Sequence, residues 1–118
     1  MNAREKGRAA EDLAADYLLA KGYTLITRRY TTKNGEIDLI ALDGETLVFL
    51  EIKQRAIAGY AEQSIGPKKL SRLSRAANKY IKETKTTRAT RYDIIAIDDE
   101  GLRHHENTFD WPDFAKST

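Results

Sequence analysis

Three charged residues, Asp38, Glu51 and Lys53, stand in two otherwise apolar stretches of the sequence. Glu51 and Lys53 are two residues apart, so a β-strand would place both side chains on the same face. Two carboxylates on neighbouring strands repel each other and are costly to bury, unless a hard divalent cation binds between them. Mg²⁺ or Mn²⁺ held by Asp38 and Glu51 would polarise a phosphodiester, while Lys53 would stabilise developing charge or position the nucleophile.

The same spacing also fits an ordinary cross-strand salt bridge between Lys53 and either Asp38 or Glu51. The Glu-x-Lys triplet is weak by itself, because residues 83–85 repeat it at a predicted helix end. Asp38 shares the face of Glu51 only if the loop between their strands has an even number of residues. Glu11, close to the apolar stripe of the first predicted helix, would add a third carboxylate or else be a solvent-facing helix residue.

The chain is predicted to begin with an amphipathic helix that ends near Gly22. It is the first of the elements that must position the charged residues. Asn2, with Glu5 three residues later, suits a capping box at its start, and Gly22 suits a left-handed residue after its end. We expect its apolar stripe to face the core. The stripe consists of Ala10, Leu13, Ala14, Tyr17 and Leu18.

Strands are predicted at residues 23–30, 36–42, 46–54 and 91–98, with a weak strand at 102–106. The strand at 46–54 is apolar on both faces, which predicts a central strand covered on two sides. Asn34-Gly35 is typical of a hairpin turn, and residues 55–66 are predicted to form a loop. Pro67 begins a second amphipathic helix that runs to about residue 84 and connects two parallel strands. The order α-β-β-β-α-β predicts an α/β fold with a mixed central sheet flanked by helices.

The chain has 118 residues, of which 41% are hydrophobic and 32% charged, and this suits one domain. We expect a core at about residues 3–106 and a C-terminal tail, residues 107–118, that packs on it through Trp111 and Phe114. No apolar run is long enough for a membrane span, and the N-terminus lacks a signal-peptide pattern. We therefore expect a soluble, cytoplasmic protein that does not associate with a membrane.

The sequence offers few residues for thiol or soft-metal chemistry. It contains no cysteine, which excludes a disulfide framework, a thiolate zinc site and a cysteine nucleophile. Its two histidines, His104 and His105, are adjacent on a predicted strand, so they point to opposite faces and cannot chelate one metal together. We expect both histidines to lie at the surface or to face a partner.

Basic residues are concentrated in the middle third of the sequence. Residues 51–91 contain eleven basic and three acidic residues, whereas residues 92–118 contain two and seven. Such a segment is typical of a polyanion-binding surface, although a solvated basic helix face would show the same pattern. The candidate contacts to nucleic acid are Arg28, Arg29, Lys33, Arg55, Lys68, Lys69 and Arg72.

Several linked motifs resemble the YraN family of small bacterial proteins, which are similar to archaeal Holliday-junction resolvases. The motifs are GRAAEDLAADYL (7–18), NGEIDLIA (34–41), LVFLEIKQR (47–55), the helix start PKKL (67–70) with Ala76-Ala77 and Tyr80, and RYDIIAI (91–97). The pattern Asp38…Glu51-x-Lys53 also resembles the PD-(D/E)xK nuclease core, with Ile37 in place of the proline. The predicted element order is that of the restriction-endonuclease-like fold.

The resemblance implies a divalent-metal-dependent endonuclease, using Mg²⁺ or Mn²⁺, that acts on structured or branched DNA. By position it makes Asp38 and Glu51 metal ligands, Glu11 a further acidic residue of the metal site, and Lys53 the catalytic lysine. A homodimer is expected by analogy, because junction resolution generally needs two symmetric active sites. Two other interpretations stay open: a non-catalytic nucleic-acid-binding module of the same fold, and an interaction adaptor that uses the apolar tail.

Overall fold

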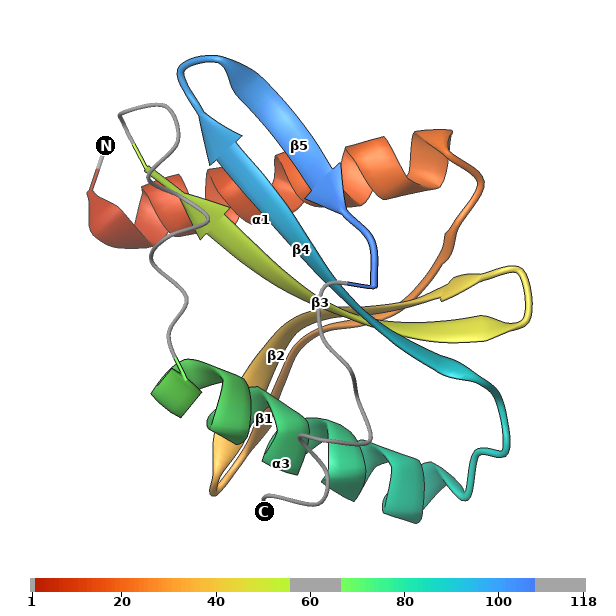
Figure 1. The fold of residues 1–118 in the computed structure, drawn as a ribbon. Helices are drawn as coiled ribbons and strands as arrows, with labels where there is room; N and C mark the ends of the chain where they lie inside the picture. Colours follow the sequence, from red (N-terminus) through yellow and green to blue (C-terminus); the bar gives the residue numbers. More distant parts are fainter. Residues whose placement is uncertain (1, 56–66, 108–118) are drawn as a thin grey trace.

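The computed structural model describes residues 2–55 and 67–107, which form one mixed sheet and two long helices (Figure 1). The predicted loop, from residue 56 to residue 66, and the tail with Trp111 and Phe114 lie outside these residues. No helix within the described ranges is long and apolar enough to cross a membrane.

Helix α1, Ala3–Ala20, begins and ends as predicted. At its start, Asn2 Oδ1 accepts the backbone N–H of Glu5 at 2.9 Å, and the Glu5 carboxylate accepts the backbone N–H of Asn2. This reciprocal pair is a capping box. After the C-cap residue Lys21, Gly22 has a φ of 93°, a left-handed conformation that favours glycine.

The predicted apolar stripe of α1 is wrong for Leu13, which is 54% exposed. Glu11, which the sequence placed at the edge of the stripe, is instead buried. Its carboxylate pairs with Arg28 and Arg29 of the neighbouring strand, whereas Leu13 is turned to solvent. The buried face of α1 therefore includes Glu11 and leaves out Leu13.

Five strands form the sheet in the order β1-β2-β3-β4-β5. They are β1 (Thr24–Thr32), β2 (Gly35–Asp43), β3 (Thr46–Gln54), β4 (Thr90–Asp98) and β5 (Gly101–His105). Neighbours are antiparallel except β3 and β4, which are parallel and are connected through helix α3, Pro67–Thr84. This confirms the predicted α/β fold with an α-β-β-β-α-β core, followed by one short strand.

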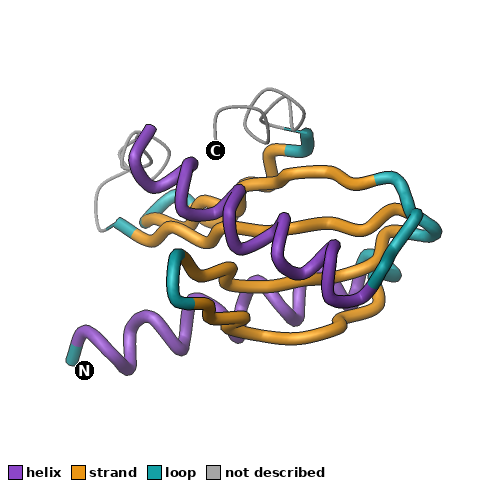
Figure 2. The backbone as a smooth tube through the Cα atoms, turned by 90° about the horizontal axis from the view of Figure 1, so that it is seen from below, coloured by secondary structure: helices purple, strands orange, loops and turns teal. Residues whose placement is uncertain are grey.

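The two helices cover opposite faces of the sheet (Figure 2). On β3, Val48 and Leu50 pack in the cluster that contains α1 residues, whereas Leu47 and Phe49 pack in the cluster that contains α3 residues. This confirms β3 as a central strand covered on both sides. Because odd-numbered positions of β3 face α3, Glu51 and Lys53 belong to the α3 side of the sheet.

Strands β2 and β3 are joined by a two-residue loop, Gly44 and Glu45, because Asp43 pairs with Thr46. The loop has an even number of residues, as the predicted site requires. Pairing ends at Leu39 opposite Leu50, although β2 continues along β1 and β3 continues along β4. Beyond that point the two strand pairs diverge, which leaves a fork between β2 and β3 (Figure 1).

The turn between β1 and β2 is formed by Lys33 and Asn34, and Gly35 is the first residue of β2. A Cβ atom at Gly35 would overlap the backbone carbonyl of Arg72 on α3. The glycine that the sequence associated with turn geometry is therefore required by close approach between the hairpin and the helix.

The prediction that both histidines lie at the surface or face a partner is wrong for His104, whose side chain is 3% exposed and packed inside this chain. Its Nε2 atom is 2.8 Å from Oδ2 of the fully buried Asp93, and its Nδ1 atom is 3.1 Å from the Tyr17 hydroxyl of α1. Arg91 also donates to Asp93. Burial by itself would raise the pKa of Asp93, but these hydrogen bonds hold it below its usual value.

Candidate functional site

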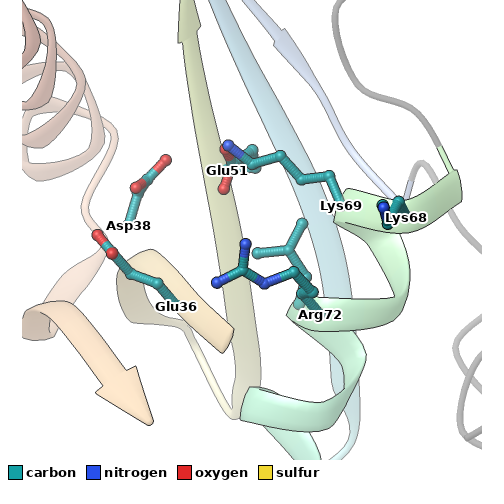
Figure 3. Close-up of a pocket in the computed structure, with 7 residues that line it drawn as sticks. Glu36, Asp38, Glu51, Lys68, Lys69 and Arg72 are labelled. Carbon is teal, nitrogen blue, oxygen red and sulfur yellow. The ribbon is translucent and has the colours of Figure 1, made fainter. Parts of the chain in front are cut away.

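A pocket of about 370 Å³ lies between the fork and the first turns of α3 (Figure 3). Acidic side chains line it from the strands and basic side chains line it from the helix. The lining residues are Glu36, Asp38, Glu51, Lys68, Lys69, Arg72 and Leu73. Two predicted metal ligands and three predicted nucleic-acid contacts therefore meet in one pocket, although they come from three separate elements.

The fork brings the carboxyl groups of Asp38 and Glu51 together. Asp38 Oδ2 accepts the backbone N–H of Ile52 at 2.8 Å, where the ladder between β2 and β3 has stopped. Glu51 is 2% exposed. Burial, followed by the negative charge of Asp38 and a hydrogen bond between the two carboxyl groups, raises the pKa of Glu51 to about 8.

This pair of carboxyl groups has the donor chemistry of a divalent metal site. Mg²⁺ and Mn²⁺ prefer oxygen ligands, and both groups present oxygens to the same pocket. Burial and the charge of Asp38 both raise the pKa of Glu51, and a bound cation would oppose both by favouring the ionised carboxylate. Asp38 and Glu51 therefore fit a hard divalent cation.

Two lysines approach Glu51 from different elements. Lys69 Nζ of α3 is 2.7 Å from Glu51 Oε1, whereas Lys53 Nζ of the same strand is 3.9 Å from this oxygen. Lys53 is mostly buried, with a side chain 15% exposed. Burial, followed by a hydrogen bond to Lys69 and the positive charge of Lys69, lowers the pKa of Lys53 to about 8. Lys53 is therefore an ammonium group with an unusually labile proton.

Glu11, the third predicted acidic residue, contacts arginines of β1. Its Oε2 atom accepts from Arg29 Nε at 2.7 Å, and its Oε1 atom is 3.9 Å from Arg28 Nε. Arg29 has a φ of 53° and lies level with Asp38 in the register of β1 and β2. Within the described ranges, Glu11, Asp38 and Glu51 do not place one oxygen each within 4.8 Å of the others.

Three of the predicted nucleic-acid contacts, Lys68, Lys69 and Arg72, lie in the first turns of α3 beside the carboxyl pair. Figure 3 shows Lys69 extended toward Glu51 and the Arg72 guanidinium directed into the pocket. The first turn of α3 contains no acidic residue. Because the N-terminus of a helix carries partial positive charge, two lysines there create a strongly electropositive edge.

The other four predicted contacts lie outside the pocket lining. Arg28 pairs with Asp12 of α1 at 2.6 Å, in addition to its contact with Glu11. Arg29 is the main partner of Glu11. Lys33 is exposed at the hairpin turn, and Arg55 is exposed after β3, where its Nη1 donates to a backbone carbonyl.

Sequence reasoning missed Glu36 and the pairing of Lys69 with Glu51. The predicted loop separates Glu51 from Lys69 in the sequence, so no spacing rule connects this pair. It also missed a polar cluster at the far side of the sheet, where Asp93, His104 and Glu106 bring three ligand-type atoms within 4.8 Å. Arg91 and Lys21 already pair with the carboxylates of that cluster, so we assign it to stability.

Comparisons with known proteins identify a family over most of the chain. A family profile described as uncharacterised protein family UPF0102 matches residues 10–97. The chain is 41% identical over 107 residues to a UPF0102 protein of Thermodesulfovibrio yellowstonii, covering 89% of this chain and 96% of the relative. It is 37% identical over 118 residues to a UPF0102 protein of Carboxydothermus hydrogenoformans, covering 94% and 100%.

Proposed function

The chain belongs to the uncharacterised protein family UPF0102, the YraN family that its motifs resemble, and we propose that it is a divalent-metal-dependent endonuclease. Family membership names no reaction, so the proposal depends on the pocket. The observation that carries it is the pairing of the buried Glu51 carboxyl group with that of the half-buried Asp38, beside Lys53 and the basic first turns of α3.

The roles follow from the chemistry of these side chains. Asp38 and Glu51 would hold Mg²⁺ or Mn²⁺, which supplies a Lewis acid for the phosphodiester and activates water. Lys53 would stabilise the charge that develops on the phosphate, because its side chain is mostly buried and charges interact more strongly where water is excluded. Glu11 would act from a distance by holding Arg29 beside Asp38, with a direct ligand role only if its ion pair opens.

Nucleic acid, and DNA in particular, is the proposed substrate. Lys68 and Arg72 would contact phosphates that flank the scissile bond, because they line the pocket and lie on the side of α3 that carries its basic residues. Because the motifs resemble those of junction resolvases, we propose structured or branched DNA as the substrate. A homodimer would then cut it, with each subunit cleaving one strand.

Cleavage assays test this function directly. End-labelled four-way-junction, linear-duplex and single-stranded DNA are incubated with the protein, with and without Mg²⁺ or Mn²⁺. We expect metal-dependent cleavage, with a preference for the junction, and a loss of roughly 100-fold or more in Lys53→Ala because charge stabilisation in the transition state is removed.

Lys85→Ala is the matched control, because Lys85 ends the other Glu-x-Lys triplet of the sequence, at the far end of α3. It should cleave like the wild type. Cleavage that Lys53→Ala leaves unchanged would refute the role of Lys53, and cleavage that persists in excess chelator would refute metal dependence.

The alternative is a nucleic-acid-binding module without turnover. One observation favours it: Glu51 already has an ammonium partner at 2.7 Å in Lys69, so this carboxyl group has a counter-ion without a metal. Salt-sensitive DNA binding that ignores divalent cations, with no cleavage of any substrate, would select this alternative.

A further inference from the structure

The closest cation to Glu51 is Lys69, not the lysine of the Glu-x-Lys triplet. Its Nζ atom is 2.7 Å from Glu51 Oε1, against 3.9 Å for Lys53. Lys69 reaches this position from the first turn of α3, across the pocket, as Figure 3 shows. The oxygen that would coordinate a metal is therefore already bound by a side chain from another element.

The charges in the pocket indicate what this contact does. Asp38 and Glu51 contribute two carboxyl groups, and Lys53 and Lys69 contribute two ammonium groups, so the inner set can balance without a metal. A divalent cation on the same carboxyl groups would leave both ammonium charges in excess. One of them must then move away, and a phosphodiester anion is the natural counter-ion for it.

Lys69 is the side chain that is able to move. Its side chain is 42% exposed, whereas that of Lys53 is 15% exposed on a central strand. Lys69 also stands at the N-terminal end of α3, where the helix dipole disfavours a cation and no acidic residue compensates. Its contact with Glu51 is therefore favourable mainly while that carboxylate has no other cation.

We propose that Lys69 is a built-in counter-ion, which occupies the cation position on Glu51 in the metal-free protein and is displaced by the divalent metal toward the substrate phosphate. This inference rests on the proposed function, because it assumes that Asp38 and Glu51 bind a metal. It adds a competition between a residue of α3 and the metal, and it couples metal binding to phosphate binding.

Calorimetric titration of Mn²⁺ into the protein without DNA tests the competition. Lys69→Met should bind Mn²⁺ roughly tenfold more tightly than the wild type, because the competing cation is removed. Lys68→Met is the matched control: it removes the same charge from the same pocket, from a residue for which Glu51 is not the ion-pair partner. Its affinity should change by less than roughly threefold. Lys69→Arg, which retains the charge, should stay near the wild type.

The results of the Mn²⁺ titration distinguish a failure of the proposed role of Lys69 from a failure of the proposed metal-dependent function. Equal gains in Lys68→Met and Lys69→Met would overturn the inference and leave the metal site intact, because only general electrostatics would then be acting. Mn²⁺ binding by Lys69→Met alone would support the inference in its strongest form. Absence of binding in all variants, with Glu51→Gln as the baseline, would overturn the proposed metal-dependent function and the inference with it.

A second measurement tests the coupling to phosphate. In a Lys53→Ala background, in which we expect cleavage to be slow, Mn²⁺ should strengthen binding of four-way-junction DNA in a gel-shift titration. Adding Lys69→Met should reduce that Mn²⁺-dependent gain by roughly half or more on a logarithmic scale, because one phosphate contact is lost. An unchanged gain would show that Lys69 does not move to the phosphate.

Discussion

Glu51 is the residue at which stability and the proposed function oppose each other. Its carboxyl group is buried beside a second carboxyl group, and two lysines only partly compensate for the desolvation. A carboxyl group with these surroundings is retained at a cost to folding, as is usual for groups that bind metals or substrates. At the residue scale, the cost should be measurable as a dependence of stability on pH.

Glu51→Gln should therefore stabilise the protein at alkaline pH. The pKa of Glu51 rises from 4.5 in the unfolded chain to about 8 in the folded protein, so the folded state holds the proton longer and wild-type stability falls between these pH values. Urea unfolding should show Glu51→Gln gaining roughly 1–3 kcal/mol relative to the wild type between pH 5 and pH 8.

Glu83→Gln is the control for that measurement, because Glu83 has the same chemistry in an exposed helix position. Its stability relative to the wild type should be nearly independent of pH in this range. A gain for Glu51→Gln that is equally independent of pH would contradict the buried, proton-binding environment of Glu51.

At the scale of elements, the site depends on how closely α3 approaches the hairpin of β1 and β2. The fork between β2 and β3 allows Asp38 and Glu51 to line the pocket, and α3 then supplies the basic wall of the pocket. Gly35 lies where the hairpin meets the backbone of Arg72, so its missing side chain sets the separation between the strand and the helix. The position of α3 thus decides whether Lys69 reaches Glu51.

Gly35→Ala should push α3 away from the hairpin. The new Cβ would overlap a backbone carbonyl, which cannot move without its helix, so we expect a loss of about 1–3 kcal/mol in urea unfolding. Gly7→Ala is the opposite case, because Gly7 is exposed in α1 with open space around it. It should gain about 0.5–1 kcal/mol from helix propensity. Equal effects would disprove the close approach at Gly35.

At the scale of the whole molecule, charge is distributed unequally between the two layers of helix. The apolar face of α3 packs on the sheet, so the opposite face, which carries basic residues, points to solvent. These basic residues follow the helix from the pocket toward its C-terminal end. Arg75 and Lys82 are exposed there, and Lys68 and Arg72 begin the same line at the pocket. Under the proposed function, this line of basic residues would attract the phosphate backbone of a substrate that enters the site.

Reversing two charges on α3 should weaken DNA binding more than reversing two on α1. For Arg75→Glu with Lys82→Glu, we expect an affinity loss of roughly tenfold or more and a salt slope smaller by about two. Arg4→Glu with Arg8→Glu changes the net charge equally, at exposed positions of α1. Fluorescence anisotropy across salt concentrations compares the two pairs, and equal losses would show that only net charge matters.

The sequence by itself determined the order of elements, and it placed the two carboxyl groups on one face on the condition that the loop between their strands is even. Caps, apolar periods and short turns act between residues that are close in the chain, so they specify α1, the strands and α3. The structure meets that condition with the two-residue loop Gly44-Glu45, so Asp38 and Glu51 share a face because side chains alternate along a strand.

Only the tertiary structure decided which partners the charged residues take. Glu11 is buried and pairs with Arg29, Leu13 is exposed, and His104 is buried against Asp93. Lys69 reaches Glu51 only because α3 docks at one rotation and one distance from the sheet. Such contacts join residues far apart in the chain, and they depend on the packing of whole elements, which no local pattern specifies.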